Sequence, residues 1–231
     1  MAPYIEQTGF TNLVDINRSM SDSINEAARK VFMSVYACPS DMGLQKNEWH
    51  RPSWARVRAN YVVNAGNTCY GQYAIGDFEF LGAPFKPRYD TPLREIHDGT
   101  SHTLMMTEVK VVPESSAWGG SISDIQTSLG GQTFTGWNAP NAGQDLVSGP
   151  IPPLEDLNAN DIPLPCRVPC GLPYRHAGGS KQQVIVARSH HPGSVNASRC
   201  DGSVGFVQDS IDEFTWRALT SAAGSETGDG L

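Results

Sequence analysis

The stretch "HHPGSVNASRCDGSV", residues 190–204, decides the fold because its pattern predicts two β-strands joined by a tight turn. The runs 195–200 and 203–207 are rich in β-prone residues and flank the dipeptide Asp201-Gly202. An Asp-Gly step between two such runs is a strong hairpin signal, since a type I′ turn needs positive φ at both central positions. The stretch therefore predicts a β-hairpin that closes a sheet.

The histidine and the aspartate of this stretch belong to different turns. A strand over residues 195–200 spans about 20 Å at about 3.3 Å per residue, which places His191 and Asp201 at its opposite ends. The two side chains therefore do not share one metal ion or one proton relay. We interpret Asp201 and Gly202 as turn residues, and we expect His191 to fix the Pro192-Gly193 turn through a backbone hydrogen bond.

Capping patterns predict two helices. Ser23 and Glu26 are spaced as a capping box before an apolar stripe, so a helix is expected over residues 23–35. Ser210 and Glu213 form a second capping box. The residues expected to face the core from that second helix are Ile211, Phe214, Trp216 and Leu219.

Further strands are predicted from β-branched and aromatic runs. They lie over residues 59–66 and 182–189, and on both sides of an Asp98-Gly99 turn within residues 93–112. Residues 113–179 are rich in Gly, Pro, Asn and Ser, which predicts a long irregular surface insertion. We expect one α+β domain over residues 1–231, with a flexible tail at about 221–231.

The charge pattern disfavours nucleic acid as a partner. The formal net charge is -7, and Lys and Arg are scattered singly, so no basic stripe is expected that would neutralise a phosphate backbone. No apolar run approaches the roughly 18 residues that a membrane-spanning helix needs. We also find no G-x-S-x-G, no H-E-x-x-H and no phosphate-binding glycine loop, and we predict that the protein is not an enzyme.

The chain has five cysteines, which match no standard zinc spacing. The closest pair, Cys166 and Cys170, is a C-x3-C without a second pair downstream. In an exported protein, Cys38 could pair with Cys69 and Cys166 with Cys170, which leaves Cys200 over. The spacing alone does not decide the connectivity.

The segment "HDGTSH" is the best candidate for a ligand site. It carries His97, Asp98 and His102 on one loop, and Glu108 lies one predicted strand later. Histidine and carboxylate ligands bind zinc or a similar ion, whereas carboxylate and carbonyl oxygens suit calcium. The structural alternative is another Asp-Gly turn around Gly99. We expect no cofactor, with calcium at this loop as the alternative.

Several segments together resemble a known family. These segments are "PYIEQ" (3–7), "ACPSD" (37–41), "NYVVNAG" (60–66), "IHDGTSHTLMMTE" (96–108) and the H-x(9)-D-G pattern from His191 to Gly202. In order and spacing they closely resemble the large planctomycete family of unknown function with a prepilin-type cleavage and methylation signal. The family is also labelled solute-binding. The resemblance implies a pseudopilin-like fold, in which a long N-terminal helix packs on an antiparallel sheet.

The resemblance also implies a location and partners. Family members usually begin with a basic leader, a processing site and a long apolar helix, so Met1 is expected to be an artificial start and the native protein to be anchored in the cell envelope. The implied function is a structural subunit of a type II secretion-like or type IV pilus-like assembly, with other pilin-like subunits or envelope proteins as partners. The alternative is an extracytoplasmic binding module for a small solute or metal ion, centred on His97, Asp98, His102 and Glu108.

Overall fold

A five-stranded sheet forms the centre of the protein, with strand order β5-β3-β4-β6-β7. All neighbouring strands are antiparallel except β3 and β5, which are parallel. The computed structural model describes residues 5–18, 22–41, 46–47, 56–57, 59–86, 89–110, 133–142 and 184–224. The strands of the sheet are β3 (Tyr61–Asn64), β4 (Leu104–Glu108), β5 (Thr133–Phe134), β6 (Ser194–Arg199) and β7 (Val204–Gln208).

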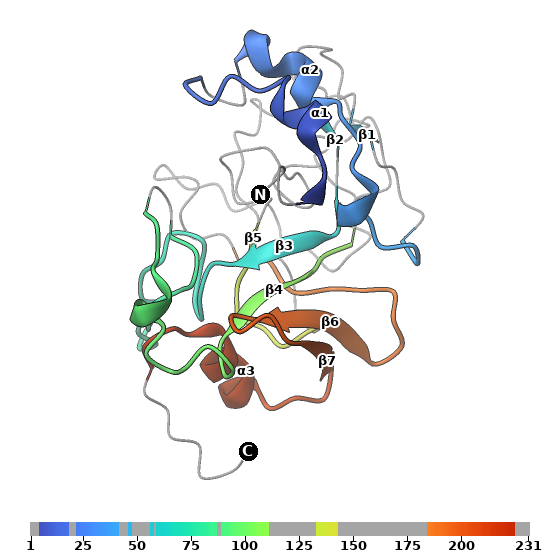
Figure 1. Cartoon of the computed structure of the whole chain (residues 1–231). Helices are drawn as coiled ribbons and strands as arrows, with labels where there is room; N and C mark the ends of the chain where they lie inside the picture. Colours follow the sequence, from blue (N-terminus) through green and yellow to red (C-terminus); the bar gives the residue numbers. More distant parts are fainter. Residues whose placement is uncertain are drawn as a thin grey trace, which may run out of the picture.

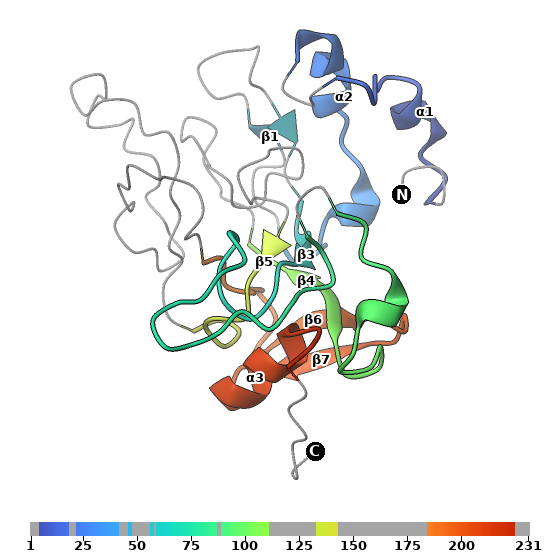
Figure 2. The ribbon, with the colours of Figure 1, turned by 90° about the vertical axis from the view of Figure 1, so that its left-hand side faces the viewer.

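Short helices lie at two ends of this sheet (Figure 1). The N-terminal helices α1 and α2 and a small β1-β2 pair lie at one end, and α3 lies at the other, close to the C-terminus; Figure 2 shows the same arrangement from the side. The helices and strands outside the five-stranded sheet are α1 (Thr8–Thr11), η2 (Ser23–Asn25), α2 (Glu26–Arg29), η3 (Ser34–Tyr36), β1 (Lys46–Asn47), β2 (Arg56–Val57), η5 (Leu93–Glu95) and α3 (Glu213–Thr220). A mixed sheet with a few short helices agrees with the predicted α+β class.

The β6-β7 hairpin forms as the sequence predicts, but with a different turn. Ser198 pairs with Val204, and the N–H of Gly202 donates to the carbonyl of Arg199 over 3.0 Å. Gly202 has φ +88, whereas Asp201 does not adopt positive φ. This is the three-residue loop with one left-handed glycine rather than the expected type I′ turn.

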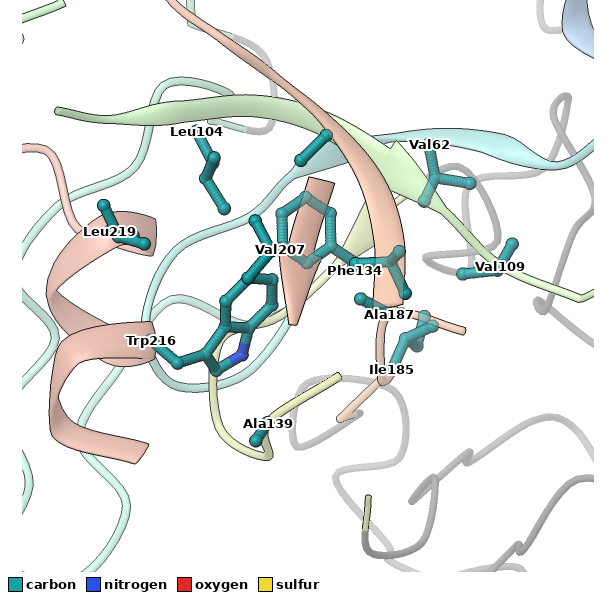
Figure 3. Packing of buried hydrophobic residues seen from close by; sticks show 12 residues of the cluster. Val62, Leu104, Val109, Phe134, Ala139, Ile185, Ala187, Val207, Trp216 and Leu219 are labelled. Carbon is teal, nitrogen blue, oxygen red and sulfur yellow. The ribbon is translucent and has the colours of Figure 1, made fainter. Parts of the chain in front are cut away.

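Helix α3 packs two buried apolar side chains, Trp216 and Leu219, against the core of the sheet (Figure 3). Trp216 is completely buried and Leu219 is 9% exposed, as predicted. Trp216 stacks obliquely on Phe134, with ring centroids 5.9 Å apart, and the core around them takes residues from all five strands. Phe214 is 64% exposed, contrary to prediction, because it precedes buried Trp216 by two residues and so lies about 200° around the helix from it. The N-cap is Asp212 rather than Ser210, and its carboxylate accepts from the Phe214 and Thr215 N–H groups.

Strand β5 corrects the prediction of a surface insertion over residues 113–179. Thr133 and Phe134 pair in parallel with Val63 and Asn64 of β3, and Phe134 is completely buried. A short β-prone and aromatic run, "TFTGW", thus supplies part of the core from within a Gly- and Pro-rich stretch. The rest of the predicted insertion lies outside the described residues.

The predicted helix over residues 23–35 is broken into short pieces. Asn25 is buried and its amide bonds both the N–H and the carbonyl of Asp15, at 2.8 and 3.1 Å. Arg29 is also buried, whereas Ile24 and Val35 of the supposed apolar stripe are more than half exposed. The buried face of this segment is therefore partly polar, which a hydrophobic period does not predict.

Two other predicted strands are not regular strands. Residues 93–95 form the three-ten helix η5, although β4 follows as predicted. Residues 184–189 are buried but irregular, and their hydrogen bonds go to three different segments. Ile185, Ala187 and Arg188 pair through their main chains with Thr135, Asn141 and Glu108.

The start of the predicted flexible tail is packed against the protein. Ser221 and Ala222 are buried, and the Ala222 carbonyl accepts from the N–H of His97 over 2.7 Å. Residues 225–231 lie outside the described part of the chain.

In the described ranges of the chain, no helix is both long enough and apolar enough to cross a membrane.

Candidate functional site

Three side chains from distant parts of the chain converge beside the end of β4. Cys38 follows η3, Glu108 is the last residue of β4, and His191 lies in the turn before β6. Nε2 of His191 is 3.6 Å from Sγ of Cys38 and 3.5 Å from Oε2 of Glu108. All three donor atoms lie within 4.8 Å of one another, and we call these residues the Cys38 cluster.

Cys38 is positioned by the side chain of Asn60. Oδ1 of Asn60 accepts from the Cys38 N–H over 2.8 Å, while Nδ2 donates to Oδ2 of Asp41 over 2.7 Å and to the Val109 carbonyl over 3.0 Å. Asn60 and Asp41 are both buried. Because Asn60 directly precedes β3, this network fixes the "ACPSD" turn against the sheet.

Glu108 is buried, with 1% of its surface exposed, and is held by the neighbouring strand. Its Oε1 accepts from the N–H of Asn196 over 2.6 Å. The other carboxylate oxygen, Oε2, is the one nearest His191. A buried carboxylate is unfavourable unless it is hydrogen-bonded and paired, so both oxygens of Glu108 need partners.

His191 is oriented by the turn that the sequence predicts. Ser189 Oγ accepts from the His191 N–H over 3.0 Å and donates to the Ser194 carbonyl over 2.6 Å. Gly193 has φ +71, which suits glycine. The side chain of Ser189, rather than that of His191, thus ties this turn to the backbone, and the His191 ring points at Cys38 and Glu108. The His191 side chain is 26% exposed, so solvent reaches the cluster along it.

Tyr61 and His190 border the cluster. Tyr61 pairs with Glu108 across β3 and β4. Burial raises the pKa of Tyr61, and the neighbouring Cys38 and Glu108 raise it further, including through a hydrogen bond between the tyrosine hydroxyl and Cys38. His190 lies on the outside, with Nε2 3.6 Å from Oδ1 of Asp41.

The predicted ligand site at the His97 loop is not assembled in the structure. Asp98 is turned toward the C-terminal segment, where its Oδ2 accepts from Ser221 Oγ over 2.8 Å and from the Gly224 N–H over 2.9 Å. Glu108 lies at the far end of β4, with His191, and not with His97 and His102. Physically, the loop and Glu108 are separated by the length of the strand between them.

The turn glycines and the turn aspartates follow the structural alternative. Gly99 and Gly202 both have positive φ, at +92 and +88. Oδ1 of Asp201 accepts from the N–H and from Oγ of Ser203, at 2.8 and 2.7 Å, and these bonds lower the pKa of Asp201. Asp201 thus bonds within its own turn, whereas Asp98 bonds to Ser221 and Gly224 of the C-terminal segment.

The cysteines that the structure describes are free thiols. Cys38 is not bridged to Cys69, since Cys38 contacts His191 while Cys69 Sγ lies 3.8 Å from the Tyr73 carbonyl, in a separate apolar cluster. Cys200 is also free, and burial together with Asp201 raises its pKa to about 11. Cys166 and Cys170 lie outside the described residues.

A family model described as "Protein of unknown function (DUF1559)" and labelled SBP_bac_10, a solute-binding label, matches residues 1–213. The chain belongs to this family. The label suggests a location outside the cytoplasm. The comparison with curated proteins gave no match, and neither did the comparison with solved structures.

Sequence reasoning missed the Cys38 cluster because its members are 70 and 83 residues apart along the chain, from Cys38 to Glu108 and from Glu108 to His191. A signal was nevertheless present. The segments "ACPSD", "NYVVNAG", "IHDGTSHTLMMTE" and the H-x(9)-D-G pattern each contribute to the cluster or its border. These segments come together beside the end of β4 only in the tertiary structure.

Proposed function

We propose that this chain is the extracytoplasmic domain of a pseudopilin-like structural subunit of the cell envelope. Its membership of the family and the solute-binding label support a location outside the cytoplasm. The order and spacing of the segments that resemble prepilin-processed proteins support the pilin-like assignment. The α+β architecture is compatible with it.

The observation that best supports a structural role is the hydrogen bonding of the two Asp-Gly turns. Asp98 ties the loop before β4 to Ser221 and Gly224, so that the C-terminal segment is fastened to the sheet. Asp201 and Gly202 close the β6-β7 hairpin. Both motifs stabilise a scaffold through short hydrogen bonds, as expected for a subunit that presents a rigid domain.

The proposed attachment is an apolar helix upstream of residue 1 in the native polypeptide. Such a helix would hold the domain at a membrane or in a filament with other pilin-like subunits or envelope proteins. The resemblance to prepilin-processed proteins supports this step, and the domain itself needs no enzymatic activity for it.

The Cys38 cluster lacks the geometry of a thiol enzyme. In a Cys-His-acid relay, the thiol and the carboxylate bond to opposite nitrogens of the imidazole. Here Cys38 and Glu108 both approach Nε2 of His191. This arrangement supports the non-enzymatic proposal. A ligand site at the His97 loop is not proposed, because Glu108 lies with Cys38 and His191.

Mass spectrometry of the mature N-terminus from fractionated source cells tests the proposal. The expected result is a methylated residue that heads a long apolar helix, in a protein recovered from the envelope fraction. A cytoplasmic protein that starts at Met1 would overturn both the anchor and the pilin-like role.

A further inference from the structure

Within the Cys38 cluster, the 3.6 Å between Cys38 Sγ and His191 Nε2 is compatible with a hydrogen bond to sulfur, but the separation between His191 and Glu108 is too long for a normal hydrogen bond. An N–H···O hydrogen bond joins heavy atoms at about 2.7–3.2 Å. The 3.5 Å between His191 Nε2 and Glu108 Oε2 is longer than that. The atoms face one another across a space that a direct hydrogen bond does not bridge.

Two of the three separations match neighbouring corners of a tetrahedral zinc site, and the third, from Cys38 Sγ to the Glu108 carboxylate, is within 4.8 Å. With Zn–S at about 2.3 Å and Zn–N and Zn–O at about 2.0–2.2 Å, tetrahedral angles place sulfur about 3.5–3.6 Å from nitrogen and nitrogen about 3.3–3.5 Å from oxygen. The protein has 3.6 Å between Cys38 Sγ and His191 Nε2, and 3.5 Å between His191 Nε2 and Glu108 Oε2. The approach of both partners to one nitrogen, which argues against a catalytic relay, is what a shared ion requires.

We infer that Cys38, Glu108 and His191 bind Zn²⁺ or a similar borderline-soft divalent ion, with a fourth position left for water or another ligand. Thiolate, imidazole and carboxylate are the three ligand types that zinc accepts in proteins. Calcium, the ion named from the sequence, takes six to eight oxygen ligands, which one carboxylate does not supply. A thiolate and an imidazole also disfavour Mg²⁺, which prefers oxygen.

The surroundings hold each ligand in place before the ion arrives. Glu108 Oε1 is occupied by the Asn196 N–H, so Oε2 is presented to the cluster. The main-chain N–H groups of Cys38 and His191 donate to Asn60 and Ser189, which fixes the two turns that carry these ligands. Such supporting hydrogen bonds orient the ligands of metal sites and raise affinity. Access is through His191, the most exposed of the three residues, at 26%.

The proposed ion would join three segments that are distant in sequence. It would fasten the turn at Cys38 and the turn at His191 to the end of β4. Since the unfolded chain has no such preformed site, binding should stabilise the fold. At a free Zn²⁺ concentration of about 100 times Kd, the Tm should rise by about 5–10 °C.

Cobalt substitution tests the site directly. The reduced, chelator-treated full chain is titrated with Co²⁺ and followed by absorption, because a thiolate ligand gives a sulfur-to-cobalt charge-transfer band and tetrahedral geometry gives intense visible bands. We expect both signals at one Co²⁺ per chain, and their loss on addition of Zn²⁺. Absence of the charge-transfer band in the wild-type chain would overturn the proposal.

Matched variants locate the ion. Cys38→Ser and His191→Gln should weaken Zn²⁺ binding by about 100-fold or more, since loss of even a supporting bond costs about 10- to 100-fold. Cys69→Ser, His190→Gln and the double change Cys166→Ser with Cys170→Ser should leave the cobalt spectrum unchanged. Near-ultraviolet circular dichroism confirms that each variant is folded. A folded Cys38→Ser chain that keeps the charge-transfer band, or its loss in the Cys166/Cys170 variant, would refute the site.

Discussion

The two ends of β4 carry polar clusters that differ in how their side chains are bonded. In the loop before the strand, Asp98 accepts two hydrogen bonds of 2.8 and 2.9 Å from the C-terminal segment. At its end, His191 stands 3.6 Å from Cys38 and 3.5 Å from Glu108. Both clusters join segments that are distant in sequence, since Asp98 bonds to Ser221 and Gly224. The comparison teaches that the cluster closed by direct hydrogen bonds is structural, whereas the cluster whose donor atoms stand further apart has the spacing of a ligand site.

Glu108→Ala should give the largest loss of stability, about 2–4 kcal/mol without metal, because it removes the acceptor of the part-buried Asn196 N–H and opens a cavity at a buried position. Urea unfolding monitored by circular dichroism measures it. Glu108→Gln keeps an oxygen for Asn196 and nearly the same volume, and should lose less than half as much. Equal losses would contradict the role of Oε1.

Asp98→Ala should lower the free energy of unfolding by about 1–3 kcal/mol, since Ser221 Oγ and the Gly224 N–H lose a charged acceptor. It should leave Zn²⁺ affinity unchanged, as measured by calorimetric titration. Asp98→Asn, which keeps one oxygen acceptor, should lie between wild type and alanine. A loss of Zn²⁺ affinity in a folded Asp98→Ala chain would reverse the comparison between the two ends of β4.

Gly202→Ala should cost about 1 kcal/mol, because a side chain is strained at φ +88 even though the space around Gly202 is open. Gly205→Ala is the matched control, since Gly205 lies nearby in β7, is equally open, and has no positive φ. It should change stability by less than about 0.5 kcal/mol. Thermal unfolding measures the stability of both variants, and equal stabilities would contradict the turn assignment.

The smallest expected effect is a change in the alkylation rate of Cys200, a second thiol that lies beside a carboxylate, that of Asp201. Its pKa of about 11, raised by burial and then by Asp201, should make alkylation at pH 8 about a hundredfold slower than that of an unperturbed thiol. Asp201→Asn keeps an acceptor for Ser203 and removes the charge, so it should speed the reaction a few-fold. Peptide mass spectrometry after timed iodoacetamide treatment measures both rates. No change in the variant would remove Asp201 as a cause.

The sequence predicts what depends on neighbouring residues. The β6-β7 hairpin, β3, β4 and the burial of Trp216 follow from β-prone runs, turn residues and helical periodicity. The predictions fail where tertiary contacts decide. Phe134 is a core residue inside an apparently irregular stretch, and buried Asn25 and Arg29 replace the expected apolar stripe.

The candidate site shows the same limit. The sequence pattern places His191 in a turn and groups Glu108, one predicted strand later, with the ligands of the His97 loop. Only the antiparallel pairing of β4 with β3 and β6 brings Glu108 to Tyr61, Asn196 and His191. The ligand set thus depends on strand register, which single-sequence patterns do not fix.

A crystal structure of the full chain with bound Zn²⁺, with anomalous data collected at the zinc edge, tests the central claim most directly. The account predicts an anomalous peak within about 2.0–2.3 Å of Cys38 Sγ, Glu108 Oε2 and His191 Nε2. Zinc bound instead by His97, Asp98 or His102, or no peak at the Cys38 cluster in a chain with this fold, would contradict it.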